Sequence, residues 1–184
     1  MGITIYFKGK LNNPDHAAPI VQELEEIAGE MEWKYNIIKE DTDYFKGIAI
    51  NPHAKSEPIS FLFDKNGNTK DFRTLGLRKH KETMSEDNFV RIKTQYAPID
   101  VHIAIIKLLK YLKKKYINDL RVIDDGCYWE TEDKELLAQK ISFLNEMMDK
   151  VANVLNTIKI EKNESKESII EKIENALRVR FGDT

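Results

Sequence analysis

The segment Asp124–Glu130 holds the most concentrated set of reactive side chains in the 184-residue chain. It contains three carboxylates, the only cysteine, a tyrosine and a tryptophan around a single glycine. An apolar run precedes it, so we expect the segment at the end of a strand, where binding groups tend to collect in mixed α/β architectures. The sequence therefore makes this segment the first candidate site.

Metal binding is the first chemistry that these side chains suggest. Histidine nitrogens and carboxylate oxygens together hold Zn²⁺, Mn²⁺ or Fe²⁺, and the available donors are His53, His102, Asp124, Asp125 and Glu130. No two histidines have the spacing that places ligands on one helix face, so a shared site requires the fold to bring distant segments together. The competing interpretation is that Asp-Asp-Gly simply turns the chain.

Nucleophilic catalysis by Cys127 is the second hypothesis, with His53 or His102 as its base. A reactive thiolate needs a basic neighbour or a helix N-terminus, either of which lowers the pKa of a thiol. The sequence neighbours of Cys127 include carboxylates, which favour the neutral thiol. We therefore predict that Cys127 is a small, half-buried apolar side chain and not a nucleophile.

The loop 51–58 (Asn-Pro-His-Ala-Lys-Ser-Glu-Pro) is the third candidate. Its two prolines restrict the backbone, which suits either a preorganised binding loop or a plain structural corner. Together the segments give one candidate binding surface, which comprises His53, Lys55, Glu57, His102, Asp124, Asp125, Tyr128, Trp129 and Glu130.

Recognisable catalytic and cofactor motifs are missing from the sequence. It contains no Gly-x-Gly-x-x-Gly, Walker A, His-Glu-x-x-His, Cys-x-x-Cys or Gly-x-Ser-x-Gly pattern. We therefore predict no bound cofactor, and we name no catalytic residue from a motif.

Composition limits the partners and the setting. The 29 basic and 31 acidic residues nearly cancel, which argues against nucleic acid as a partner, since phosphate binding needs a concentrated positive field. A single cysteine forms no internal disulfide, which favours a reducing cytoplasm. No apolar run has the length of a membrane span, so we predict a soluble globular protein without a membrane partner.

The N-terminal half predicts a strand at 3–8, a helix that begins at Asn13-Pro14, and strands at 33–37 and 48–50. Asn66-Gly67 predicts a two-residue hairpin loop, which places Phe61 opposite Phe72 and Phe63 opposite Lys70. The charged stretch 73–87 follows, and we interpret it as a long loop or flap. A further strand is expected through Val90 and Ile92.

The C-terminal half predicts a helix from Pro98 to Tyr116, a strand at 120–124 and a long helix at 132–156. Apolar residues repeat along this long helix in steps of four and three, which is typical of a helix that packs against other helices. A polar linker at 159–165 and a last helix complete the pattern.

This order of elements predicts an α+β fold, with a two-layer, mostly antiparallel or mixed sheet of about 5–7 strands and helices on one face. A doubly wound parallel sheet is the second choice. We predict a single α+β domain at 1–158, a linker at 159–165, and a C-terminal helix at 166–184 that packs on the domain or in an oligomer interface.

Two classes of function fit the sequence. The first is a non-catalytic binding or self-association module, with loops 51–58 and 73–87 and segment 124–130 as contact surfaces and a protein or a second copy as partner. The long helix supports association if its broad apolar face is exposed, unless the last helix covers that face. The alternative is a small metal-assisted hydrolase that uses the histidines and carboxylates named above.

Overall fold

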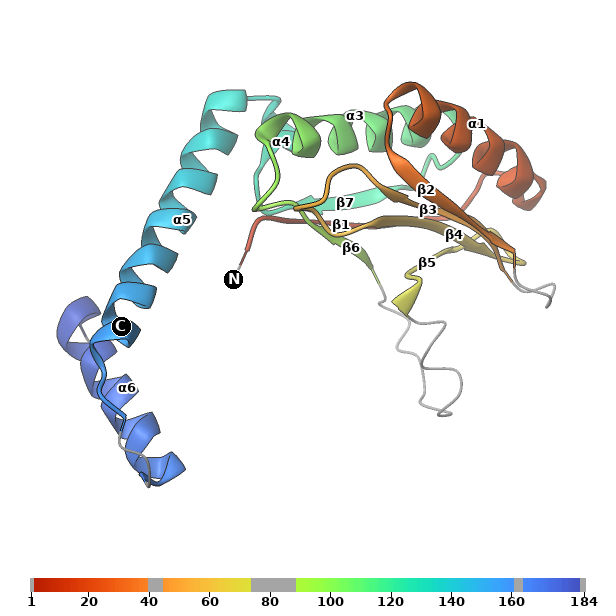
Figure 1. The fold of residues 1–184 in the computed structure, drawn as a ribbon. Helices are drawn as coiled ribbons and strands as arrows, with labels where there is room; N and C mark the ends of the chain where they lie inside the picture. Colours follow the sequence, from red (N-terminus) through yellow and green to blue (C-terminus); the bar gives the residue numbers. More distant parts are fainter. Residues whose placement is uncertain (1, 40–44, 74–88, 161–163, 183–184) are drawn as a thin grey trace. The chain divides into compact units, whose positions relative to one another are not determined.

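The structure, a computed structural model, describes residues 2–39, 45–73, 89–160 and 164–182. The chain forms two compact units, which we call unit 1 (Met1–Ala138) and unit 2 (Gln139–Thr184). Unit 1 contains antiparallel sheets with helices against one face, and unit 2 is helical (Figure 1). The predicted α+β class is therefore confirmed, whereas the predicted division at 158 and 165 stays a prediction.

Unit 1 contains two antiparallel sheets. In the first, β1 (Thr4–Lys8) lies between β6 (Val90–Lys93) and β7 (Arg121–Asp124). The second has the strand order β2-β3-β4-β5, with the bounds Lys34–Lys39, Phe45–Asn51, Ile59–Asp64 and Thr69–Lys70. The sheets are joined after β1, because Lys10 bridges to Asn68 and the Thr69 N–H donates to the Gly9 carbonyl oxygen over 2.9 Å.

Helices α1 (Ala17–Glu30) and α3 (Ile99–Lys115) lie against one face of these strands (Figure 1). A short 3₁₀ helix, η1 (Pro14–His16), precedes α1, and the Asn13 side chain accepts a hydrogen bond from the Asp15 N–H as the sequence predicted. The core between the layers contains fully buried side chains from both, among them Ile5, Phe7, Ile20, Leu24, Phe61, Ile105 and Leu109.

The predicted helix at 132–156 forms as one continuous helix, and a short helix that the sequence did not predict precedes it. The short helix α4 (Tyr128–Thr131) ends at Glu132, whose left-handed backbone (φ 54°) stops it. Helix α5 (Lys134–Thr157) then begins, with the Asp133 side chain accepting from the N–H groups of Glu135 and Leu136. Helix α6 (Lys166–Phe181) begins at Ser165, whose side chain accepts from the Ser168 N–H.

The hairpin at Asn66-Gly67 forms, but its predicted register is wrong by one residue. Phe63 pairs with Thr69 and Leu62 with Lys70, so the loop has three residues, 65–67. Of the loop residues, only Gly67 has a positive φ (82°), whereas a two-residue type I′ loop needs a positive φ at Asn66 as well. Phe61 therefore does not face Phe72 and instead packs on Phe7, with ring centroids 5.6 Å apart. The predicted flap at 73–87 lies, apart from Arg73, outside the described residues.

Two glycine substitutions test the backbone conformation of this turn. Gly67→Ala should lower the free energy of unfolding by about 1 kcal/mol or more, because the position has a positive φ and a Cβ there would lie 3.0 Å from that of Leu11. Gly29→Ala, at an open helical position in α1, should raise it by about 0.4–1 kcal/mol. Urea unfolding of both variants provides the measurement, and equal effects at the two sites would contradict the assigned turn.

Candidate functional site

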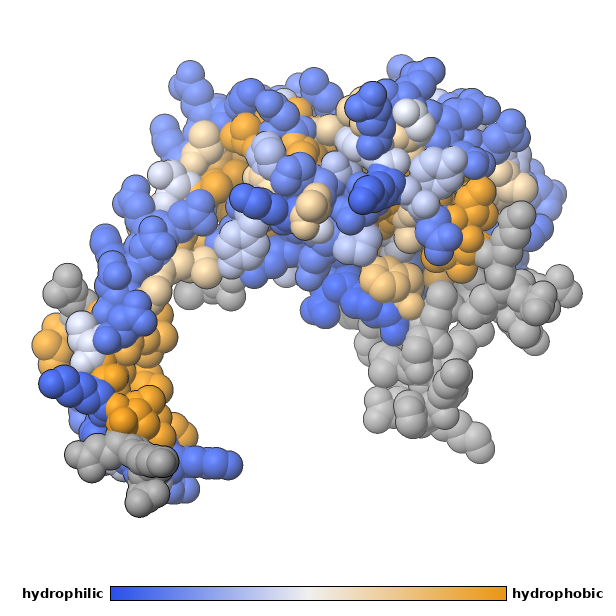
Figure 2. All heavy atoms as spheres, in the orientation of Figure 1, coloured by the Kyte–Doolittle hydropathy of each residue, from blue (hydrophilic) through white to orange (hydrophobic). Residues whose placement is uncertain are grey.

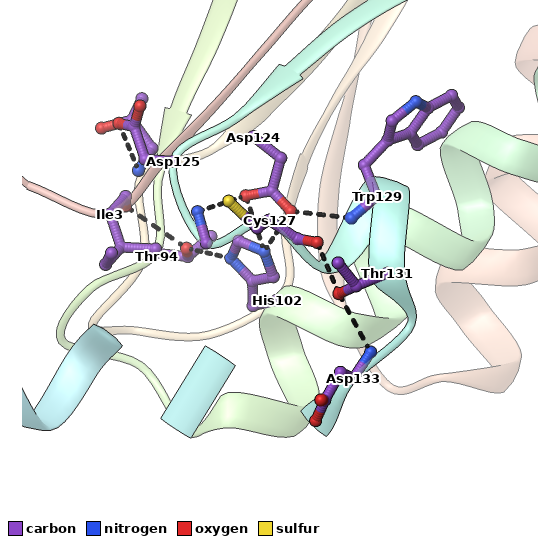
Figure 3. Close-up of polar contacts among 11 residues, drawn as sticks. Ile3, Thr94, His102, Asp124, Asp125, Cys127, Trp129, Thr131 and Asp133 are labelled. Atoms are coloured by element: carbon purple, nitrogen blue, oxygen red, sulfur yellow. Dashed lines mark hydrogen bonds and ion pairs between the residues drawn. The ribbon is translucent and has the colours of Figure 1, made fainter. Parts of the chain in front are cut away.

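Two of the predicted site residues, His102 and Asp124, meet in the interior of unit 1 and are joined there by Thr94 (Figure 3). The Nε2 atom of His102 lies 3.1 and 3.2 Å from the two carboxylate oxygens of Asp124. Its Nδ1 atom lies 2.7 Å from the Thr94 hydroxyl. The side chains of His102 and Asp124 are 1% and 0% exposed. We call these three residues the buried triad.

All side-chain polar atoms of the buried triad have partners. Because the ionised Asp124 only accepts, Nε2 carries the hydrogen between His102 and Asp124, and Nδ1 shares a hydrogen bond with the Thr94 hydroxyl. The Asp124 carboxylate also accepts from the N–H groups of Gly126, over 2.7 Å, and Trp129, over 3.0 Å. A hydroxyl, an imidazole and a carboxylate in series resemble nucleophilic machinery in composition, but here the hydroxyl belongs to a buried threonine.

The pKa of the Asp124 carboxyl depends on burial and on hydrogen bonds to its charged form. Burial alone would raise the pKa of this carboxyl, but the hydrogen bonds from His102, Trp129 and Gly126 together hold its pKa below the usual 3.8. The carboxylate is therefore ionised at neutral pH in a site without solvent. Such an arrangement suits a structural hydrogen-bonded carboxylate, which depends on every partner staying in place.

The buried triad connects elements that are distant in sequence. Thr94 follows β6, His102 lies in the first turns of α3, and Asp124 ends β7. The Thr94 N–H donates to the Ile3 carbonyl oxygen at the start of β1, and the Trp129 N–H belongs to α4. The triad therefore links distant elements of unit 1. Because it has no exposed reactive atom, we interpret it as a structural contact.

The rest of the segment Asp124–Glu130 behaves as a structural corner. Asp125 exchanges hydrogen bonds with the Thr4 backbone, Cys127 is half-buried with a left-handed backbone (φ 60°), and Tyr128 is buried. The ring of Trp129 is half-buried, and the ammonium groups of Lys110 and Lys113 lie 5.5 and 5.8 Å from its centroid. Glu130 is exposed.

The loop 51–58 is closed by its own hydrogen bonds. The Nδ1 atom of His53 accepts from the Lys55 N–H over 3.0 Å, and the His53 carbonyl oxygen accepts from Ser56. Glu57 exchanges hydrogen bonds with the backbone of Lys93 in β6, so the loop is fixed to the strand that precedes Thr94. Lys55 is exposed. The loop is thus an ordered corner beside β6.

The donors of the metal hypothesis do not form a ligand set in the part of the chain that the structure describes. His102 and Asp124 bind each other, and no group of three or more histidine, cysteine, aspartate or glutamate side chains is arranged there to hold an ion. A protein site for a catalytic zinc normally supplies three ligands. The hydrolase hypothesis therefore gains no support from the described geometry.

Unit 2 carries a different kind of candidate surface. Helices α5 and α6 run in opposite directions, and α6 lies beside the last turns of α5 (Figure 1). One edge of the pair holds a groove of about 470 Å³, lined by Asn153, Val154, Thr157, Asn175, Ala176 and Val179. Large apolar side chains are exposed on both helices, and Figure 2 shows them gathered over this part of the chain.

Three exposed large apolar side chains of unit 2 lie at matching heptad positions, whereas Phe143, Ile160 and Val179 are exposed outside that pattern. Met148 and Leu155, seven residues apart on α5, are 41% and 40% exposed, and Ile170 on α6 is 55% exposed. Leu155 lies about half a turn from Asn153 and Thr157, so it points away from the groove. The sequence named two loops, segment 124–130 and the long helix as candidate contact surfaces, but it did not name Thr94 or Ile170. The heptad spacing was the signal for the helical surface.

No family model matches the chain, and no match was found among the curated proteins or the solved structures compared with it. Within the described residues, no helix is long and apolar enough to cross a membrane.

The buried triad predicts a specific dependence of stability on pH. Because the pKa of Asp124 is lowered by folding, its contribution is present above pH 3.8 and is lost as the pH falls through the folded-state pKa. Asp124→Asn should cost about 1–3 kcal/mol near neutral pH. The difference in unfolding free energy between wild type and variant should shrink below pH 3.8. Denaturant unfolding over a pH series tests this, and a difference that stays constant into acid would refute it.

A side chain at position 126 should clash with the neighbours of the buried triad. A Cβ at this position would lie 2.5 Å from Cδ1 of Leu137 and 3.1 Å from Nε2 of His102. Gly126→Ala should therefore destabilise unit 1 by about 1–3 kcal/mol through overpacking. Combining it with Leu137→Ala removes the closest atom, so the two substitutions should be non-additive in a double-mutant cycle of unfolding free energies. Strict additivity would show that the contact does not exist.

Proposed function

We propose that this protein is a non-catalytic binding module whose contact surface is an apolar strip on unit 2. The strip consists of Ile141, Met148 and Leu155 on α5, and Ile170 and Leu177 on α6. Its partner is a pair of amphipathic helices, which would complete a helical bundle. The observation that carries the proposal is the exposure of Met148, Leu155 and Ile170 at heptad positions of both helices.

The small core of unit 2 supports this proposal. Val154 is the one large apolar side chain of the described part of unit 2 that is buried. A unit of this size rarely stabilises itself without additional burial, a metal or a disulfide. Fully burying a Met, Leu or Ile side chain contributes about 1.5–3 kcal/mol, so covering the exposed half of three such side chains would contribute roughly 3 kcal/mol per chain. A partner on the strip would therefore stabilise unit 2 appreciably.

The charge of unit 2 favours a protein partner. Residues 139–184 contain eight basic and eight acidic side chains, so their formal net charge is zero. Helices that lie on membranes usually carry an excess of Lys and Arg on their polar face, and nucleic-acid surfaces need a positive field. Neither condition is met. We place the module in the cytoplasm, since its one cysteine requires no oxidising compartment.

Unit 1 serves as the scaffold in this proposal. Its only converging group of site residues, among those described, is the buried triad, which has no solvent-exposed reactive atom. An enzyme needs such groups at a concave, accessible surface. The geometry therefore supports binding more than catalysis.

Binding of an apolar dye tests the strip. At high dilution, the full chain should enhance the fluorescence of anilinonaphthalene sulfonate, and Met148→Glu or Ile170→Glu should lower that enhancement at least about 2-fold by charging the strip. Val179→Glu is the matched control, because Val179 is exposed on the groove edge of the same helix as Ile170. Equal dye fluorescence in all variants, or a loss in the control alone, would contradict the proposal.

A further inference from the structure

Apart from Phe143 and Ala152, the apolar residues of α5 in unit 2 form three columns, each with a spacing of seven residues. The first column is Ile141, Met148 and Leu155, the second is Leu144, Val151 and Ile158 just past the helix end, and the third is Met147 and Val154. Helix α6 has the same three columns, given by Ile170 with Leu177, by Ile173, and by Ile169 with Ala176. Both helices thus have the same broad apolar face.

The contact between α5 and α6 uses only part of this face. Val154, in the third column of α5, is buried, and the matching residues Ile169 and Ala176 of α6 are partly covered. Three of the five first-column side chains, Met148, Leu155 and Ile170, are exposed. A helix with one neighbour needs a narrow seam of two columns, whereas a helix in a bundle has two neighbours and needs a wider one. Within the described part of unit 2, each helix therefore has one helical neighbour for a face of this width.

We propose that the second neighbours are α5 and α6 of a second copy of this chain, so that two copies of unit 2 form a four-helix bundle. This inference rests on the proposed function and names its partner. The strip is self-complementary, because both helices present the same heptad column to it, as a two-fold dimer requires. The zero net charge of residues 139–184 allows two copies to approach without repulsion.

The size of the strip fits a dimer. The stretch of α5 from Ile141 to Thr157 is about 24 Å long at 1.5 Å per residue, and each helix is about 10 Å wide. The two helices therefore present roughly 500 Å² per copy, or about 1,000 Å² for both, which is near the lower limit of specific interfaces. The dimer should consequently dissociate measurably on dilution, which makes it accessible to experiment.

Sedimentation equilibrium of the full chain over a wide concentration range tests the dimer. The wild type should approach twice the 21.4 kDa chain mass as concentration rises. Met148→Glu and Ile170→Glu should each raise the dissociation constant by about 10-fold or more, because the dimer would bury a charge.

Val179→Glu is the control for this measurement, because Ile170 and Val179 are nine residues apart, which places them on opposite sides of α6 at about 3.6 residues per turn. This control should dimerise like the wild type. Far-ultraviolet circular dichroism shows whether each variant remains helical, and the uncharged Leu155→Asn gives a second, milder change that should also weaken the dimer.

Each result has a definite consequence. A single-chain mass at every concentration overturns the dimer, and so does a dimer that survives both strip variants but is lost in Val179→Glu. If the chain is monomeric and strip-dependent dye binding persists, the proposed function stands and the partner is a different protein. If the chain is monomeric and dye binding does not depend on the strip, both proposals fail.

Discussion

The fold of unit 1 depends on the hydrogen-bonded pair of His102 and Asp124, which is removed from solvent and completed by Thr94. An isolated buried charge is very costly, so the pair persists only because each polar atom has a partner. Those partners come from the ends of β6 and β7 and the beginning of α3, with backbone donors from α4. The pair therefore determines how these elements meet, and it explains why reactive residue types gather there without an exposed site.

The close packing around the pair has a second consequence for the chain. Gly126 leaves room for Leu137, which lies in the first turn of α5 and is fully buried. The start of α5 is thus anchored in the core of unit 1, whereas most apolar side chains of its continuation in unit 2 are only partly covered. One helix therefore changes from a core element to a surface element along its length.

Local patterns predicted the elements well. Alternation indicated β1 and β6, Asn13-Pro14 marked a real helix start, and the spacing of four and three identified α5. The errors arose where a backbone angle decided the outcome. The hairpin register depends on whether Asn66 shares the positive φ of Gly67, and the short helix α4, which the sequence did not predict, ends at the left-handed backbone of Glu132. Residue type permits either conformation at such positions, and packing selects one.

The sequence by itself determined the fold class, because periods of two and of three to four apolar residues dictate which faces are buried. It also predicted a broad apolar face on the long helix. Only the tertiary structure decided that His102 meets Asp124 and Thr94. His102 is 22 residues from Asp124 and 8 residues from Thr94 in sequence, and the packing of the sheet against α3 brings them together. It likewise decided which apolar column α6 leaves uncovered, because the relative rotation of two helices depends on side-chain packing and not on periodicity.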